Sequence, residues 1–177
     1  MKKVLMRNHD VPQPGKGCNR YEILVVDDNP DTLLLLEEIL QKEGYSVTCK
    51  ESGKESLEAA KSGNFDLILL DILMPEMDGF EVCRQLKENP KTKDIPVIFL
   101  TIADDPEYII QGLNFGAVAY ITKPFTKYEI VAIIRPHVQL YRMKKILLRH
   151  LKEYSNDDAE KISGLVDDLV KCLEVER

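Results

Sequence analysis

Between residues 21 and 136, short apolar runs alternate with longer amphipathic stretches five times. The runs, such as residues 23–26 and 65–70, contain few polar residues and are too short for an ordinary helix. Near-continuous apolar strands belong in a parallel sheet that helices cover on both faces. Right-handed crossovers then restrict the chain to a doubly wound sheet, so the predicted fold class is α/β with five parallel strands.

Turn and capping signals divide this region into the expected elements. The Asn29-Pro30 pair is typical of a helix start and Gly44 of its end, and Ser52 begins a second helix with a capping box. Further helices are expected at 80–88, 105–115 and 126–135. Strands are expected at 23–26, 45–49, 65–70, 96–100 and 118–121.

Polar residues lie one or two positions after four of these strands. They are Asp27 and Asp28 after the first, Asp71 after the third, Thr101 after the fourth and Lys123 after the fifth. In a doubly wound sheet the functional site lies at the carboxyl ends of the strands. Three neighbouring carboxylates repel one another unless a cation lies between them, and oxygen ligands alone favour Mg²⁺. A nearby hydroxyl and ammonium would suit a phosphoryl group, so we expect one carboxylate to accept it.

Four segments that carry these residues resemble the receiver domain of two-component response regulators. They are LVVDD at 24–28, LDILMPEMDG at 70–79, VIFLT at 97–101 and YITKPF at 120–125. The resemblance covers about residues 21–136 and implies a flavodoxin-like sheet with strand order 2-1-3-4-5. It also implies a signalling module, not an enzyme, that receives a phosphoryl group from a histidine kinase or a phosphotransfer protein.

The resemblance implies a role for each matching acidic residue. Asp71 matches the phosphoacceptor of the family. Asp27 and Asp28 match the acidic pair that binds Mg²⁺, with Asp71 and the backbone carbonyl of Leu73 as further ligands.

Other matching residues imply a conformational switch. Thr101 and Lys123 match the hydroxyl and the amine that contact the phosphoryl group, and Tyr120 matches an aromatic side chain that moves inward with Thr101. Pro124 matches a proline that follows a cis peptide bond. Phosphorylation is then expected to shift a surface around the fourth helix and fifth strand that binds a partner or a second copy of the chain.

Purely structural interpretations stand beside these roles. Asp27 would cap the next helix, although the Asn-Pro pair that follows already provides that start. Thr101 would be an ordinary strand-end residue, and Tyr120 a core aromatic. At Ile102 the chain departs from the family, which usually has a small residue there. We expect this bulky side chain to alter the lifetime of the phosphoryl group.

Two other functions remain open. One is a receiver fragment of a larger hybrid histidine kinase. The other is a Mg²⁺-dependent phosphatase that forms an aspartyl-phosphate intermediate. Such an enzyme needs a second acid two residues after its nucleophile, where this chain has Leu73.

Both ends of the chain are expected to lie outside the receiver domain at 21–136. Residues 1–20 contain prolines and glycines without periodicity and predict a flexible leader. Pro136 is expected to interrupt the last helix, and residues 137–177 to form a helical extension, either a hairpin or a coiled-coil segment. Residues 137–153 have five basic residues and one acidic residue, and 154–177 have three basic and seven acidic residues. These opposite charges suit an antiparallel hairpin or a homodimer through these helices.

Composition excludes several other classes of protein. A net charge of −6 and a pI near 5.2 argue against a nucleic-acid binder. No apolar run reaches the roughly 18–20 residues that cross a bilayer. The four cysteines include no C-x-x-C pair, which indicates reduced thiols. The chain is therefore predicted to be cytoplasmic, with no nucleic-acid or membrane partner.

Overall fold

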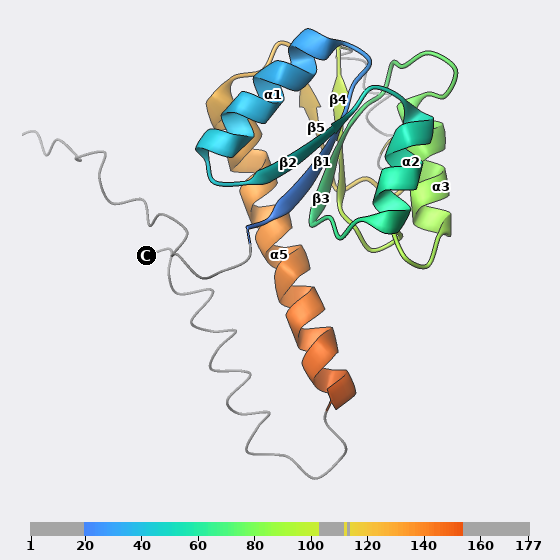
Figure 1. Cartoon of the computed structure of the whole chain (residues 1–177), viewed down its shortest axis with the longest axis vertical. Helices are drawn as coiled ribbons and strands as arrows, with labels where there is room; N and C mark the ends of the chain where they lie inside the picture. Colours follow the sequence, from blue (N-terminus) through green and yellow to red (C-terminus); the bar gives the residue numbers. More distant parts are fainter. Residues whose placement is uncertain (1–19, 103–111, 113, 154–177) are drawn as a thin grey trace, which may run out of the picture.

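The computed structural model describes residues 20–102, 112 and 114–153. Five parallel strands form one sheet in the order β2-β1-β3-β4-β5 (Figure 1). Their bounds are β1 (Glu22–Val26), β2 (Ser46–Lys50), β3 (Leu67–Asp71), β4 (Val97–Thr101) and β5 (Ala119–Thr122). The predicted doubly wound α/β sheet and its strand order are confirmed.

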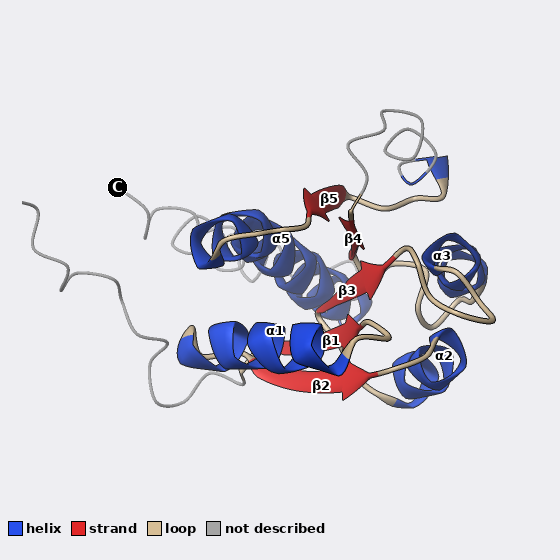
Figure 2. Cartoon of the chain, turned by 90° about the horizontal axis from the view of Figure 1, so that it is seen from above, coloured by secondary structure: helices blue, strands red, loops and turns tan. Residues whose placement is uncertain are grey.

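Helices cover both faces of this sheet. On one face lie α1 (Pro30–Lys42) and α5 (Lys127–Glu153), and on the other lie α2 (Gly53–Ser62) and α3 (Gly79–Glu88) (Figure 2). Successive residues of β1 point to opposite faces, so Val25 packs in the α1 and α5 layer and Val26 in the α2 and α3 layer. Because both faces are covered, the polar residues of these strands gather at their ends.

The capping signals act as the sequence predicts. The side chain of Asn29 accepts hydrogen bonds from the backbone N–H groups of Asp31 and Thr32, at 2.9 and 3.3 Å. The hydroxyl of Ser52 accepts one from the N–H of Glu55 at 3.3 Å. Strand limits differ from the predicted ones by one or two residues. The leader up to residue 19, most of the helix predicted at 105–115 and the second helix of the extension lie outside the described residues.

The predicted interruption at Pro136 is wrong, because α5 runs through this residue from Lys127 to Glu153. Ile130 and Ile134 before the proline and Val138 after it are buried on the same face of the helix. Packing against the sheet therefore continues across Pro136 and holds the helix together although its N–H group is missing. Figure 1 shows α5 extending well beyond the sheet. Among the described residues, no helix is long and apolar enough to cross a bilayer.

Candidate functional site

Three carboxylates meet at the carboxyl ends of β1 and β3. These strands are neighbours in register, with Val26 opposite Leu70, so Asp27 and Asp71 leave them side by side. Oxygen atoms of Asp27, Asp28 and Asp71 all lie within 4.8 Å of one another. The residue Asp27 is 0% exposed and Asp71 is 4% exposed, whereas Asp28 faces solvent.

Lys123 reaches this cluster from the loop after β5, the strand at one edge of the sheet. Its Nζ donates hydrogen bonds to Asp27 Oδ2 at 2.7 Å and to Asp71 Oδ1 at 2.6 Å. The backbone N–H of Lys123 donates to the carbonyl of Thr101 at 2.7 Å, which ties the residues after β5 to the end of β4. The Lys123–Pro124 peptide bond is cis, as the resemblance implied.

Backbone contacts hold the two buried acids in place. Asp27 Oδ1 accepts a hydrogen bond from the N–H of Asn29 at 3.0 Å, so the start of α1 orients this carboxylate. After β3 the chain turns back, and the N–H of Gly79 donates to the carbonyl of Ile72 at 2.9 Å. A Cβ on Gly79 would lie 2.2 Å from the backbone oxygen of Asp71. A side chain at this position would therefore push against the strand end that carries Asp71.

The charges of the cluster do not balance. Burial raises the pKa of Asp71 above its ordinary 3.8, while the hydrogen bond from Lys123 opposes the rise. Burial lowers the pKa of Lys123, but its hydrogen bonds with Asp27 and Asp71 outweigh burial and the net change is upward. Three acidic side chains and one basic side chain meet here, so the acids outnumber the base by two. Oxygen donors with this excess charge fit a hard divalent cation.

The remaining predicted residues lie on β4, on β5 and in the loop after β3. Thr101 is the last residue of β4 and is buried, one position beyond Leu100, which pairs with Asp71. Leu73 lies in the loop after β3 with its side chain exposed. Tyr120 lies on β5 opposite Phe99 and is 40% exposed, so in this conformation its side chain is not a core aromatic.

Sequence reasoning overlooked Gly79 as part of the site. The Asp-Gly pair at 78–79 is a sequence signal for a turn that leads into a helix. In the structure Asp78 caps α3 by accepting a hydrogen bond from the N–H of Glu81 at 2.8 Å. The same loop contains Glu76 with a φ of 65°, in the left-handed region. The backbone of this loop is therefore tightly specified beside Asp71.

Comparisons with known proteins agree with this geometry. The model of the response regulator receiver domain family matches residues 23–135. Over 152 residues the chain is 41% identical to a probable cyclic di-GMP phosphodiesterase of Vibrio cholerae, a match that covers 86% of this chain and 34% of that protein. It is 37% identical over 126 residues to the response regulator ArlR of Staphylococcus saprophyticus, covering 71% of this chain and 56% of the relative. The chain thus spans between about a third and three fifths of the length of these relatives.

Solved structures are similar over the same region. The chemotaxis protein CheY4 of Vibrio cholerae has a TM-score of 0.65 at 30% identity, covering 67% of this chain and 98% of CheY4. The receiver domain of a sensor histidine kinase from Pseudomonas aeruginosa has a TM-score of 0.64 at 29% identity, covering 68% of this chain and 98% of that one. That structure contains a magnesium ion in its active-site cleft. The chain therefore belongs to the family of response regulator receiver domains.

Proposed function

We propose that this chain is a phosphoacceptor and that Asp71 takes up the phosphoryl group. The observation that supports this best is the position of the Lys123 amine, 2.6 Å from Asp71 and 2.7 Å from Asp27. The amine opposes the effect of burial and so favours the ionised form of this carboxylate, which is the nucleophile that the reaction needs.

The reaction is a transfer from a phosphohistidine of a kinase or a phosphotransfer protein. A carboxylate oxygen of Asp71 attacks phosphorus, the P–N bond breaks, and the histidine nitrogen keeps the electron pair and takes a proton from solvent. The product is an acyl phosphate on Asp71. Lys123 then pairs with a phosphoryl oxygen, and the hydroxyl of Thr101 approaches another from the end of β4.

The donor set of the site suits magnesium. The carboxylates of Asp27, Asp28 and Asp71 would hold the ion, together with the backbone carbonyl of Leu73. When bound, the ion would neutralise negative charge on the phosphoryl oxygens during transfer.

We further propose that the acyl phosphate changes the surface near β5. Movement of Thr101 toward the phosphoryl group would leave space into which the half-exposed ring of Tyr120 turns. The altered face, formed by β5 and the segment before it, would bind a partner or a second copy of the chain. The chain would then work as a switch, either alone or as the receiver part of a larger protein such as a hybrid histidine kinase.

The phosphatase alternative has less support. Leu73 occupies the position two residues after Asp71 and cannot donate or accept a proton. Steady release of phosphate from a phosphomonoester in the presence of Mg²⁺ would favour the enzyme over the switch.

The test is incubation with acetyl phosphate and Mg²⁺, followed by intact mass measurement. We expect the wild type to gain one phosphoryl group with acetate as the leaving group. Asp71→Asn should gain none, and Asp31→Asn, an exposed acid of α1, should match the wild type. Uptake by Asp71→Asn at the wild-type level would contradict the proposal. Beryllofluoride with Mg²⁺, followed by measurement of oligomeric state, tests the change at the β5 face.

A further inference from the structure

A second buried acid lies at the other end of β3. Asp66 directly precedes this strand and is 1% exposed, and its Oδ2 accepts a hydrogen bond from the backbone N–H of Glu22 at 3.1 Å. It lies beside the amino ends of β1 and β3, whereas Asp71 lies at the carboxyl ends. The proposed phosphoryl chemistry makes no use of Asp66.

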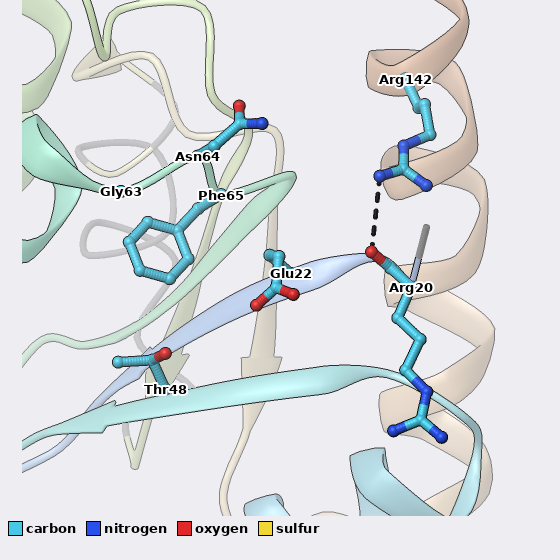
Figure 3. A pocket seen from close by; sticks show the side chains of 7 residues that line it. All are labelled: Arg20, Glu22, Thr48, Gly63, Asn64, Phe65 and Arg142. Atoms are coloured by element: carbon cyan, nitrogen blue, oxygen red, sulfur yellow. Dashed lines mark hydrogen bonds between the residues drawn. The ribbon is translucent and has the colours of Figure 1, made fainter. Parts of the chain in front are cut away.

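The cations that face Asp66 come from α5. Arg142 Nη2 lies 3.2 Å from Asp66 Oδ2, and Lys145 Nζ lies 3.5 Å from Oδ1. Lys145 also donates a hydrogen bond to the side chain of Asn64 at 2.7 Å. Figure 3 shows the Arg142 guanidinium extending from α5 toward the start of β1, where it donates to the carbonyl of Arg20 at 3.4 Å.

Further contacts of the same helix segment reach the receiver body. The guanidinium of Arg142 lies over the ring of Tyr21, 4.5 Å from its centre. Lys144 forms an exposed ion pair with Asp94 at 2.7 Å. Three of the five basic residues at 137–153 therefore pair with the acidic receiver. The sequence suggested that the acidic residues at 154–177 would balance this positive charge. In the structure, acidic residues of the receiver itself pair with most of it.

These contacts contribute unequally to stability because they are buried to different extents. A charge removed from water is costly to leave without its partner, so the Asp66 contacts resist separation. The Lys144–Asp94 pair is about half exposed on both sides and is screened by water, so it contributes little. Asp66 is therefore the principal polar anchor of this part of the helix.

We propose that Asp66 is an internal docking site for the basic segment 137–148 of α5. This segment then belongs to the receiver body, and the helix leaves the domain in a fixed direction. The contacts also fix its rotation, because Arg142 and Lys145 follow the buried Val138 at the spacing of one helix face. Leu140, which is 66% exposed, is held on a different side. A partner of α5 would therefore meet one defined helix face.

Hydrogen–deuterium exchange on the full chain tests this inference. Asp66→Asn removes the charge but keeps an oxygen for the N–H of Glu22, and the double variant Arg142→Gln, Lys145→Gln removes the cations. We expect both to speed exchange of the amides at 139–148 by about tenfold or more, with β4 and β5 unchanged. The matched control Asp94→Asn breaks only the exposed pair and should change these rates less than about twofold.

Two results would overturn the inference. One is that the amides at 139–148 exchange in the double variant as slowly as they do in the wild type. The other is Asp66→Asn accelerating exchange in β4 and β5 as much as in the helix, which would make Asp66 a general folding residue. If Asp66→Asn does not fold, the double variant decides, because its substitutions lie in α5 and not in the sheet. The outcome does not depend on whether Asp71 accepts a phosphoryl group.

Discussion

Asp66 directly precedes β3 and Asp71 is the last residue of that strand, and both are almost fully buried, at 1% and 4% exposed. Among the described side chains, Asp66 faces two cations, Arg142 and Lys145. Asp71 instead shares one amine, that of Lys123, with Asp27 and lies beside a third acid, Asp28. The charge at the amino end of β3 is therefore matched within the chain. The carboxyl end keeps an excess of negative charge, which is the condition for taking up a divalent cation.

This excess predicts a pH-dependent stability in metal-free buffer. Burial raises the pKa of Asp71, so the native state keeps this proton to a higher pH than the unfolded chain, and stability falls as pH rises through that pKa. We expect Asp71→Asn to raise the free energy of unfolding at pH 7 by about 1 kcal/mol. The gain should shrink toward pH 4. Urea denaturation with EDTA at both pH values measures it.

Asp94→Asn is a control of opposite sign for this experiment. The hydrogen bond from Lys144 lowers the pKa of Asp94, so its contribution to stability is present at pH 7 and is lost as pH falls through the lowered pKa. Because the Lys144–Asp94 pair is exposed, Asp94→Asn should lower stability at pH 7 only slightly, and it should differ still less from the wild type in acid. A gain from Asp71→Asn that grows toward pH 4 would contradict our account of the cluster.

Gly79→Ala should damage both the fold and the site. The new Cβ would lie 2.2 Å from the backbone oxygen of Asp71 and 2.9 Å from Ile72 Cα, and backbone cannot move aside cheaply. We expect a loss of about 2 kcal/mol or more in the free energy of unfolding and a lower rate of phosphoryl uptake. Gly116→Ala is the control for the cost of replacing a glycine away from the site. Its φ of 89° makes alanine costly there, but the added Cβ would be nearest to the side chain of Lys87. Normal uptake by Gly79→Ala would show that the turn does not position Asp71.

The sequence was sufficient to predict the sheet and the cluster because both depend on regular geometry. Apolar runs and capping residues locate strands and helices, and parallel strands bring their carboxyl ends to one edge. Asp27, Asp28, Asp71 and Lys123 therefore converge as predicted. The strand order came from the family resemblance, since composition and periodicity alone do not distinguish one doubly wound order from another.

Features that depend on distant contacts were not predictable in this way. The partners of Asp66 lie in a helix that the sequence appeared to interrupt at Pro136, and only packing of α5 against the sheet brings Arg142 to that carboxylate. The role of Gly79 depends on the close approach of a loop to the end of β3. Neither feature has a periodic signal.

Ile102→Ala should shorten the lifetime of the acyl phosphate. Ile102 is 65% exposed and directly follows Thr101 in the chain, so we expect its bulky side chain to hinder the approach of water to the site. We expect dephosphorylation to be about threefold faster in the variant, a change of less than 1 kcal/mol in the barrier. Leu140→Ala removes an equally exposed side chain from α5 and is the control. Equal rates in the wild type and Ile102→Ala would refute this role.

Pro136→Ala should stabilise the chain. Proline lacks the N–H that would bond to the carbonyl of Ala132, and Pro136 is exposed, so its ring has few contacts to lose. The restored helix bond outweighs the extra freedom of the unfolded chain, which costs about 0.4–1 kcal/mol. We expect the free energy of unfolding, measured by thermal unfolding, to rise by about 1–2 kcal/mol. Tyr128→Ala, at an 83% exposed position of the same helix, controls for helix propensity alone. A loss of stability in Pro136→Ala would mean that the proline bends α5 toward Asp66, and the docked segment would then depend on it.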